Sequence, residues 1–205
     1  MTDPIYRQPR GIPSGGQFAA QARSDSEVTL LDAPTQPGEY VDEERHHWLD
    51  RSYTVRVNAA TGLTDDEFNG VVDDFVIAAL WSTPDDSDID FDENPSGMLD
   101  GRFSRDDLAP SARDAIREVA NQFLSENRDD VREALGRKDY RADDGTGPLG
   151  MLGHDMFLTS AGHGVGFWDR DALRAGGLGT RLTEASKKVE EIRLYPGDDG
   201  KLYAE

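Results

Sequence analysis

The sequence has no cysteine among its 205 residues. This absence excludes a disulfide framework, a thiolate zinc site and a cysteine nucleophile. The sequence also lacks the G-x-S-x-G, H-E-x-x-H and Walker patterns, which mark serine hydrolases, zinc proteases and phosphate-binding loops. A metal site in this chain would therefore have to use histidine and carboxylate ligands.

Long hydrophobic runs are missing as well. No apolar stretch approaches the roughly 18 residues that a membrane helix needs. The opening residues, MTDPIYRQPRGIPSGGQF, have no apolar segment of the kind found in a secretory signal. We therefore expect a protein of the host-cell cytoplasm that does not bind membranes.

Positive charge is scarce, with 22 basic against 41 acidic residues and a net charge of −19. Residues 61–150 hold 9 of the basic and 23 of the acidic side chains, so that this segment alone carries −14. Such a field repels nucleic acids and attracts basic partners. Two interpretations follow: the acidity serves only solubility, including in a saline cytoplasm, or it engages a basic surface of a protein that handles nucleic acid.

The composition along the chain predicts a flexible arm over residues 1–48 and a single α+β domain over residues 49–205. The arm is rich in Pro, Gly, Ser and Gln without a sustained period. For the domain we expect a small antiparallel sheet with two or three packed helices. An acidic helical part, 61–144, would precede a ββαββ part, 153–205.

Two helices and one strand are predicted in the first half of the domain. Apolar residues alternate over 50–60, which indicates a half-buried strand. Thr64 and Glu67 form a capping-box pattern before a helix over 65–81, and Trp81 at its end is expected to fill the core. Pro110 begins a second helix of about 25 residues, with a break near Asn127.

The polar segment between these helices carries four alternating aspartates, Asp86, Asp88, Asp90 and Asp92. Their spacing resembles the start of a calcium loop, but Phe91 and Gly97 replace the turn glycine and the bidentate glutamate. In an extended chain these carboxylates would lie about 6.6 Å apart, close to the phosphate spacing of a nucleic-acid strand. The segment is thus a solvated loop, a weak cation site or an acidic binding surface, with mimicry of nucleic acid conceivable.

The final 50 residues alternate in a way that predicts strands over 155–160 and 165–169, joined by a turn at 161–164. A helix over 178–190 and two further strands, 192–195 and 201–203, complete the ββαββ part. The aromatic residues of the first hairpin would either pack in the core or form an interface between copies of the chain.

Histidines and aspartates in this hairpin are the candidate catalytic residues. His163 would occupy the tip and His154 the base, about 25 Å apart, so they could not share one ion. His154, Asp155 and Asp169 would meet Arg170 at the base. Such a cluster suits hydrogen bonding and ion pairing, and alternatively catalysis in a small hydrolase or nucleotide-modifying enzyme. For His163 we expect a partner contact or a simple turn role.

Residues 153–171, GHDMFLTSAGHGVGFWDRD, resemble a family of bacteriophage and prophage proteins. The similarity rests on Gly-His-Asp, Leu-Thr, Gly-His-Gly and Gly-Phe-Trp-Asp-Arg in this order, and it extends over roughly residues 65–203. The segment RQPRGIPSGGQFA separately resembles the amino termini of proteins from actinobacterial mobile elements. The resemblance implies a phage or mobile-element origin and no particular activity or cofactor.

The sequence therefore predicts a non-enzymatic acidic binding protein without a cofactor. The expected binding residues are the four aspartates at 86, 88, 90 and 92 together with His163, and the expected partner is a basic protein surface. The enzyme built on His154, Asp155 and Asp169 is one alternative, and a structural or accessory protein is the other.

Overall fold

The computed structural model describes residues 35–47, 51–87 and 92–205. The chain divides into a unit of Met1–Asp32, which lies outside these ranges, and a unit of Ala33–Glu205. All that follows concerns the second unit. Most of the predicted arm, and Asp88 and Asp90 of the acidic loop, thus fall outside the described residues.

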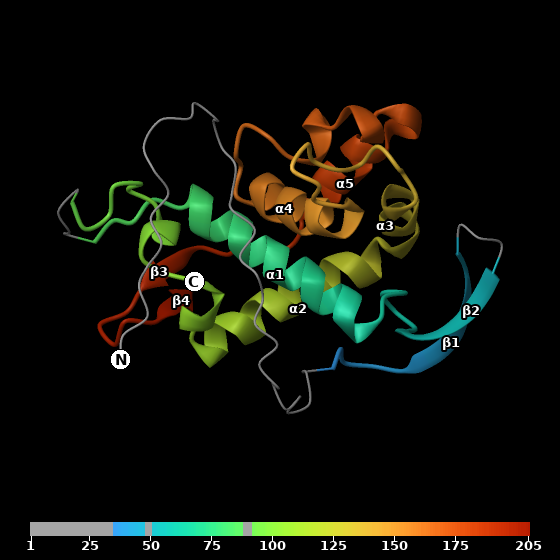
Figure 1. The fold of residues 1–205 in the computed structure, drawn as a ribbon, viewed down its shortest axis with the longest axis horizontal. Helices are drawn as coiled ribbons and strands as arrows, with labels where there is room; N and C mark the ends of the chain where they lie inside the picture. The colour runs from blue at the N-terminus through green and yellow to red at the C-terminus, as the bar shows by residue number, and fades with distance from the viewer. Residues whose placement is uncertain (1–34, 48–50, 88–91) are drawn as a thin grey trace, which may run out of the picture. The chain divides into compact units, whose positions relative to one another are not determined.

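The fold is α+β, as the sequence predicted (Figure 1). Its strands form two separate antiparallel pairs in the described ranges, and five α-helices accompany them. In chain order the elements are β1 (Tyr40–His47), β2 (Arg51–Asn58), α1 (Asp65–Ser82), α2 (Pro110–Glu126), α3 (Arg128–Leu135), α4 (Pro148–Ser160), α5 (Leu178–Ser186), β3 (Leu194–Pro196) and β4 (Leu202–Ala204).

The first strand pair lies partly in the predicted arm. β2 matches the predicted strand, and it pairs with β1 so that Tyr40 lies opposite Asn58. Half of the residues of β1, YVDEERHH, are charged, and the strand has no apolar alternation. Its pairing with β2 and its ion pairs to the helices, rather than a buried face, hold this strand in place.

Helix α1 runs through the middle of the fold, with α4 along one side and α2 crossing the other (Figure 1). The predicted capping box is present: the Glu67 amide donates to Thr64 Oγ1, and the Thr64 amide donates to the Glu67 carboxylate. α4 approaches α1 closely at Gly153, where a Cβ would lie 2.4 Å from the Val71 carbonyl oxygen. Glycine at this position therefore allows the two helices to pack backbone to backbone.

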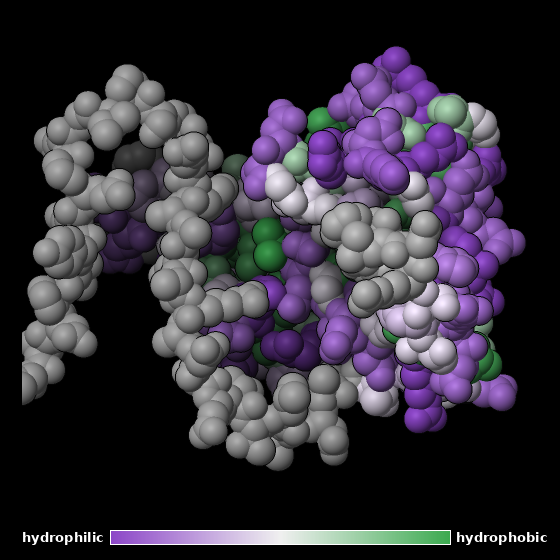
Figure 2. Space-filling view, turned by 45° about the vertical axis from the view of Figure 1, so that its right-hand side comes forward, coloured by the Kyte–Doolittle hydropathy of each residue, from purple (hydrophilic) through white to green (hydrophobic). Residues whose placement is uncertain are grey.

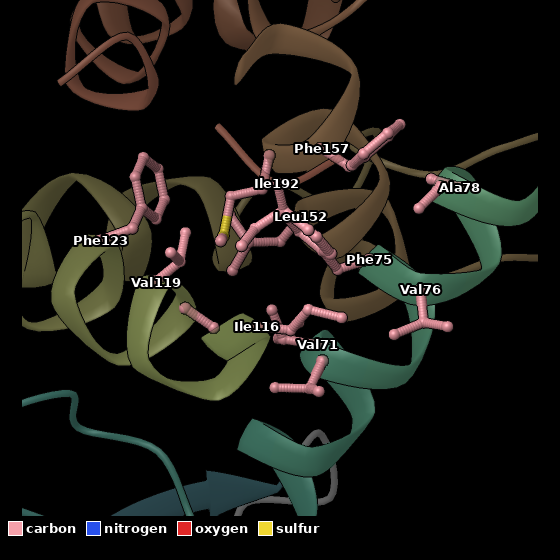
Figure 3. Close-up of a cluster of buried hydrophobic side chains, with 14 of the residues drawn as sticks. Val71, Phe75, Val76, Ala78, Ile116, Val119, Phe123, Leu152, Phe157 and Ile192 are labelled. Carbon is pink, nitrogen blue, oxygen red and sulfur yellow. The ribbon is translucent and has the colours of Figure 1, made fainter. Parts of the chain in front are cut away.

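The core lies where α1, α2 and α4 meet (Figure 3). Phe75 of α1 meets Phe157 of α4 edge to face, with ring centroids 5.2 Å apart. Phe123 of α2 stacks on Phe167, which follows α4, at 5.8 Å. These two aromatic pairs connect all three helices and the turn after α4.

The break predicted near Asn127 is also present, and it separates α2 from α3. The Asn127 side chain donates to the Phe123 carbonyl at 2.8 Å, and its own carbonyl accepts from the Val131 amide. Asn127 thereby closes one helix and opens the next.

The predicted hairpin over 155–169 is wrong, because residues 148–160 form helix α4 and residues 167–169 form a short 3₁₀ turn. Both faces of α4 are buried, so its apolar run shows neither a strand nor a helix period, and such runs are ambiguous in sequence. Gly162, with a φ of 70°, caps the helix: the His163 amide donates to the Leu158 carbonyl, and the Gly162 amide to the Thr159 carbonyl. This pattern is a Schellman cap rather than a hairpin turn.

The surface in Figure 2 is largely hydrophilic, with hydrophobic residues gathered in small groups. Trp81 does not fill the core as predicted, since 42% of it is exposed. In the described ranges, no helix is both long and apolar enough to cross a membrane.

Candidate functional site

The structure brings Asp155 and Arg170 together, as the sequence analysis expected, although in a helix and turn rather than in a hairpin. Asp155 is fully buried on α4. It accepts hydrogen bonds from Arg170 Nε at 2.9 Å, from Arg170 Nη2 at 2.5 Å and from the Tyr140 hydroxyl at 2.9 Å. Both of its oxygens are thus occupied by protein donors.

Burial raises the pKa of Tyr140 well above its ordinary value, and the neighbouring Asp155 charge adds to this effect. Tyr140 therefore stays a neutral donor to Asp155. With a neutral donor and a bidentate arginine around it, this carboxylate has the environment of a structural ion pair. It is not placed to activate water.

The other two candidate catalytic residues lie apart from this pair. The His154 ring is tilted against Trp81 of α1, with ring centroids 6.5 Å apart. Because His154 and Asp155 are neighbours on a helix, their side chains leave it about 100° apart. Asp169 is exposed, and its carboxylate makes no hydrogen bond or ion pair with a described residue.

His163 is half-buried beside the end of α4, with its ring 5.9 Å from the Phe157 ring. It borders a shallow depression of about 450 Å³ whose other side is formed by Trp168 and by α5. The aromatic residues of this segment were expected either to pack in the core or to form an interface. Trp168 is 52% exposed, so it does not pack in the core.

The described residues of the acidic segment between α1 and α2, 83–87 and 92–109, form a folded loop. We call residues 83–109 the acidic connector; they contain nine acidic and two basic residues. Asn94 is buried and donates to the Asp85 carboxylate at 3.0 Å and to the Met98 carbonyl at 2.9 Å. The Leu99 amide donates to the Thr83 carbonyl, and the Leu99 side chain is fully buried. The folded conformation of this loop was not predicted from the sequence. The one local sign of it is Asn94, a residue typical of turns, three positions before the turn at Gly97.

Asp85 is the interior anchor of the acidic connector, and Arg102 Nε lies 2.7 Å from its carboxylate. Burial disfavours the charged form of Asp85, but hydrogen bonds from Arg102 and Ser87 outweigh burial and hold its pKa below the ordinary value. Gly101 leaves room for this arrangement, since a Cβ there would lie 1.9 Å from Asn94 Oδ1.

Other carboxylates of the acidic connector point outward. Asp86, Asp92, Glu93, Asp100 and Asp106 are exposed and form no ion pair with a described residue.

The two cations of the acidic connector are held by carboxylates. Arg102 pairs with Asp85, and Arg105 Nη1 lies 2.6 Å from Asp73 of α1. The acidic connector therefore presents a surface of uncompensated negative charge.

A possible metal site and similar proteins were the two remaining sources of information about function. Among the residues that the structure describes, no group of three or more histidines and carboxylates could hold a metal ion. Comparison of the chain with models of known families, with curated proteins and with solved structures finds no match. The resemblance to phage proteins stays a prediction.

Proposed function

We propose that this protein is a non-enzymatic binding protein of phage or mobile-element origin, and that its acidic connector engages a basic surface on a partner protein. The observation that carries the proposal is the folded state of the described residues of the acidic connector, 83–87 and 92–109. Its carboxylates are displayed on a loop anchored by Asn94 and Leu99, so binding would not have to order the described parts of this loop.

Charge placement supports a basic partner. Arg102 and Arg105 are turned toward Asp85 and Asp73, which leaves the outward carboxylates without a competing cation of the acidic connector. A surface of this kind accelerates association with a basic partner at low salt and repels nucleic acid. The partner expected from this chemistry is the basic face of a protein that itself handles nucleic acid.

The catalytic alternative has less support. Asp155 is saturated by Arg170 and Tyr140, while His154 and Asp169 do not join it. No observation favours a reaction at these residues over the structural role of the Asp155 ion pair.

Two variants of equal net charge test the proposal. Asp92→Asn, Glu93→Gln and Asp100→Asn together remove three outward carboxylates of the acidic connector. Glu190→Gln, Glu191→Gln and Asp198→Asn remove three exposed carboxylates elsewhere. The probe is a fluorescent 20-residue peptide of alternating lysine and serine, titrated at 20 mM and 150 mM salt.

We expect the variant in the acidic connector to weaken binding about tenfold at low salt, since each exposed charge contributes roughly 0.5 kcal/mol, and the matched variant to change it much less. Equal weakening by both variants would mean that only net charge matters and would refute the proposal. Failure of the unmodified protein to bind the peptide at 20 mM salt would refute it as well.

A further inference from the structure

A cleft of about 880 Å³ lies between the β1–β2 pair and the helices, away from the acidic connector. Its outer wall comes from the strand pair and includes Tyr53, which is 47% exposed. Its inner wall comes from the end of α3 and the start of α4, where Leu135, Pro148 and Leu149 provide apolar surface. This volume falls in the range of pockets that hold small molecules.

Most charged side chains of the cleft are compensated by one another. Arg45 pairs with Glu43 at 3.2 Å and with Glu67 at 2.5 Å, and Arg132 pairs with Glu43 at 3.1 Å. These pairs link the strand pair to α1 and α3. They leave neither an excess cation nor an excess anion on this part of the lining.

Asp74 of α1 is the exception. It lines the cleft, is half-buried, and makes no ion pair or hydrogen bond with a residue in the described ranges. Burial raises the pKa of this carboxyl above its ordinary value, with His154 opposing the effect. A partly buried carboxylate without a hydrogen bond or an ion pair is unfavourable for folding, and such groups are often found at binding sites.

The start of α4 packs closely on the Asp74 carboxylate, because Gly150 has no side chain. At Gly150 a Cβ would lie 3.0 Å from Asp74 Oδ2 and 2.6 Å from Thr146 Cγ2. Any larger residue at this position would press on the carboxylate. Pro148 and Leu149, the two residues before Gly150, provide apolar surface within the same cleft.

We propose that this cleft binds a small organic ammonium ion with an apolar body, and that Asp74 is its counter-ion. The ammonium group donates to the Asp74 carboxylate, while the apolar body lies between Tyr53 and the side chains of Leu135 and Leu149. The site is independent of the acidic connector and of a protein partner.

Three matched ligands test this site by isothermal titration with the full chain. They share a naphthalene ring and differ in charge: 2-(1-naphthyl)ethylamine, 2-(1-naphthyl)ethanol and 1-naphthylacetate. We expect the amine to bind about tenfold more tightly than the alcohol, because a charge-assisted hydrogen bond to a partly buried carboxylate is worth about that factor. The acetate should bind most weakly.

Three variants locate the interaction. Asp74→Asn should abolish the preference for the amine over the alcohol. Tyr53→Ser, on the outer wall, should weaken the amine and the alcohol alike, by about fivefold. Glu190→Gln, which makes the same charge change at an exposed position outside the lining of the cleft, should preserve the preference.

Equal binding of the amine and the alcohol by the unmodified protein would overturn the proposal, as would tighter binding of the acetate. Absence of amine binding at millimolar concentration would also overturn it. An amine preference that survives in Asp74→Asn would assign the ammonium group to another residue and would equally contradict the proposal.

Discussion

Asp155 carries a buried charge that three donors surround, and its substitution separates a structural from a catalytic role. Asp155→Asn leaves Arg170 without its counter-charge, so the free energy of unfolding should fall by about 3 kcal/mol. Urea denaturation measures this change. The matched Asp169→Asn, at an exposed position, should stay within about 0.5 kcal/mol of the unmodified protein. Equal midpoints for the two variants would contradict the structural role.

For Asp74 we expect the opposite effect of removing the charge, namely a gain in stability, because its ionised form is disfavoured in the folded protein. Burial and the neighbouring Asp73 raise the pKa of Asp74 above its ordinary value of 3.8, against the opposing charges of His154 and Arg105. Since the folded-state pKa is the higher one, ionisation lowers stability at neutral pH, and this loss disappears as the pH falls to 3.8 and below.

Asp74→Asn should therefore unfold at a higher temperature than the unmodified protein at pH 7. Thermal unfolding followed from pH 7 to pH 3.5 should show the two melting temperatures converging at the acid end. A variant that is less stable at pH 7 would show that the carboxylate stabilises the fold, which would contradict the account of this residue.

At the scale of elements, the contact of α1 with α4 depends on glycine. Gly153→Ala would place a methyl group 2.4 Å from the Val71 carbonyl oxygen and 2.9 Å from the Phe75 amide nitrogen, and neither backbone atom can move alone. We expect a loss of about 2–3 kcal/mol in the free energy of unfolding. Denaturant titration provides the measurement.

Gly70→Ala, in helix α1, is the matched control for Gly153→Ala in helix α4. Gly70 lies inside α1, where nothing lies within 4 Å of a Cβ. Alanine should here stabilise the protein by about 1 kcal/mol through helix propensity. The same sign for both substitutions would show that Gly153 is not a close-contact position.

The acidic connector depends on Asn94, whose amide group ties Asp85 to the Met98 carbonyl. Asn94→Ala should accelerate amide hydrogen exchange at Leu99 by about tenfold, because the loop loses three side-chain hydrogen bonds, one of them donated to Asn94 by the Ser96 hydroxyl, while exchange in α4 stays unchanged. Glu118→Gln, an exposed change on α2, serves as the control. Unaltered exchange at Leu99 would mean that other contacts order the loop.

Elements with a clear local signal could be predicted from the sequence. The capping box at Thr64 and the proline at 110 fixed two helix starts to the residue, and Asn127 marked the break. α4 could not be predicted because it is buried on both faces, and because glycines such as Gly150 and Gly153 disfavour a helix. Their purpose is close packing on α1 and space for Asp74, which only the tertiary structure reveals.

At the scale of the whole molecule, the distribution of charge could be read from the sequence but its pairing could not. The excess of acidic residues over 61–150 predicted an acidic surface. The structure adds that cations of this segment are used internally, as in the Arg102–Asp85 and Arg105–Asp73 pairs. His154, Asp155 and Asp169 were expected to meet at the base of a hairpin. Because a helix replaces this hairpin, His154 and Asp169 do not join Asp155.

The two proposed sites lie in different parts of the fold. In Figure 1 the acidic connector follows the carboxyl end of α1, at left, and the β1–β2 pair that forms the outer wall of the cleft lies near the amino end, at right. Binding at one site can therefore be measured in variants of the other.

The most direct test of the acidic binding surface is a titration of the ¹⁵N-labelled protein with the lysine–serine peptide, followed by amide chemical shifts. The account predicts that the largest shifts fall at residues 92–107 of the acidic connector and that raising the salt concentration to 150 mM reduces them. Shifts of similar size on every acidic surface, or a maximum outside the acidic connector, would contradict it.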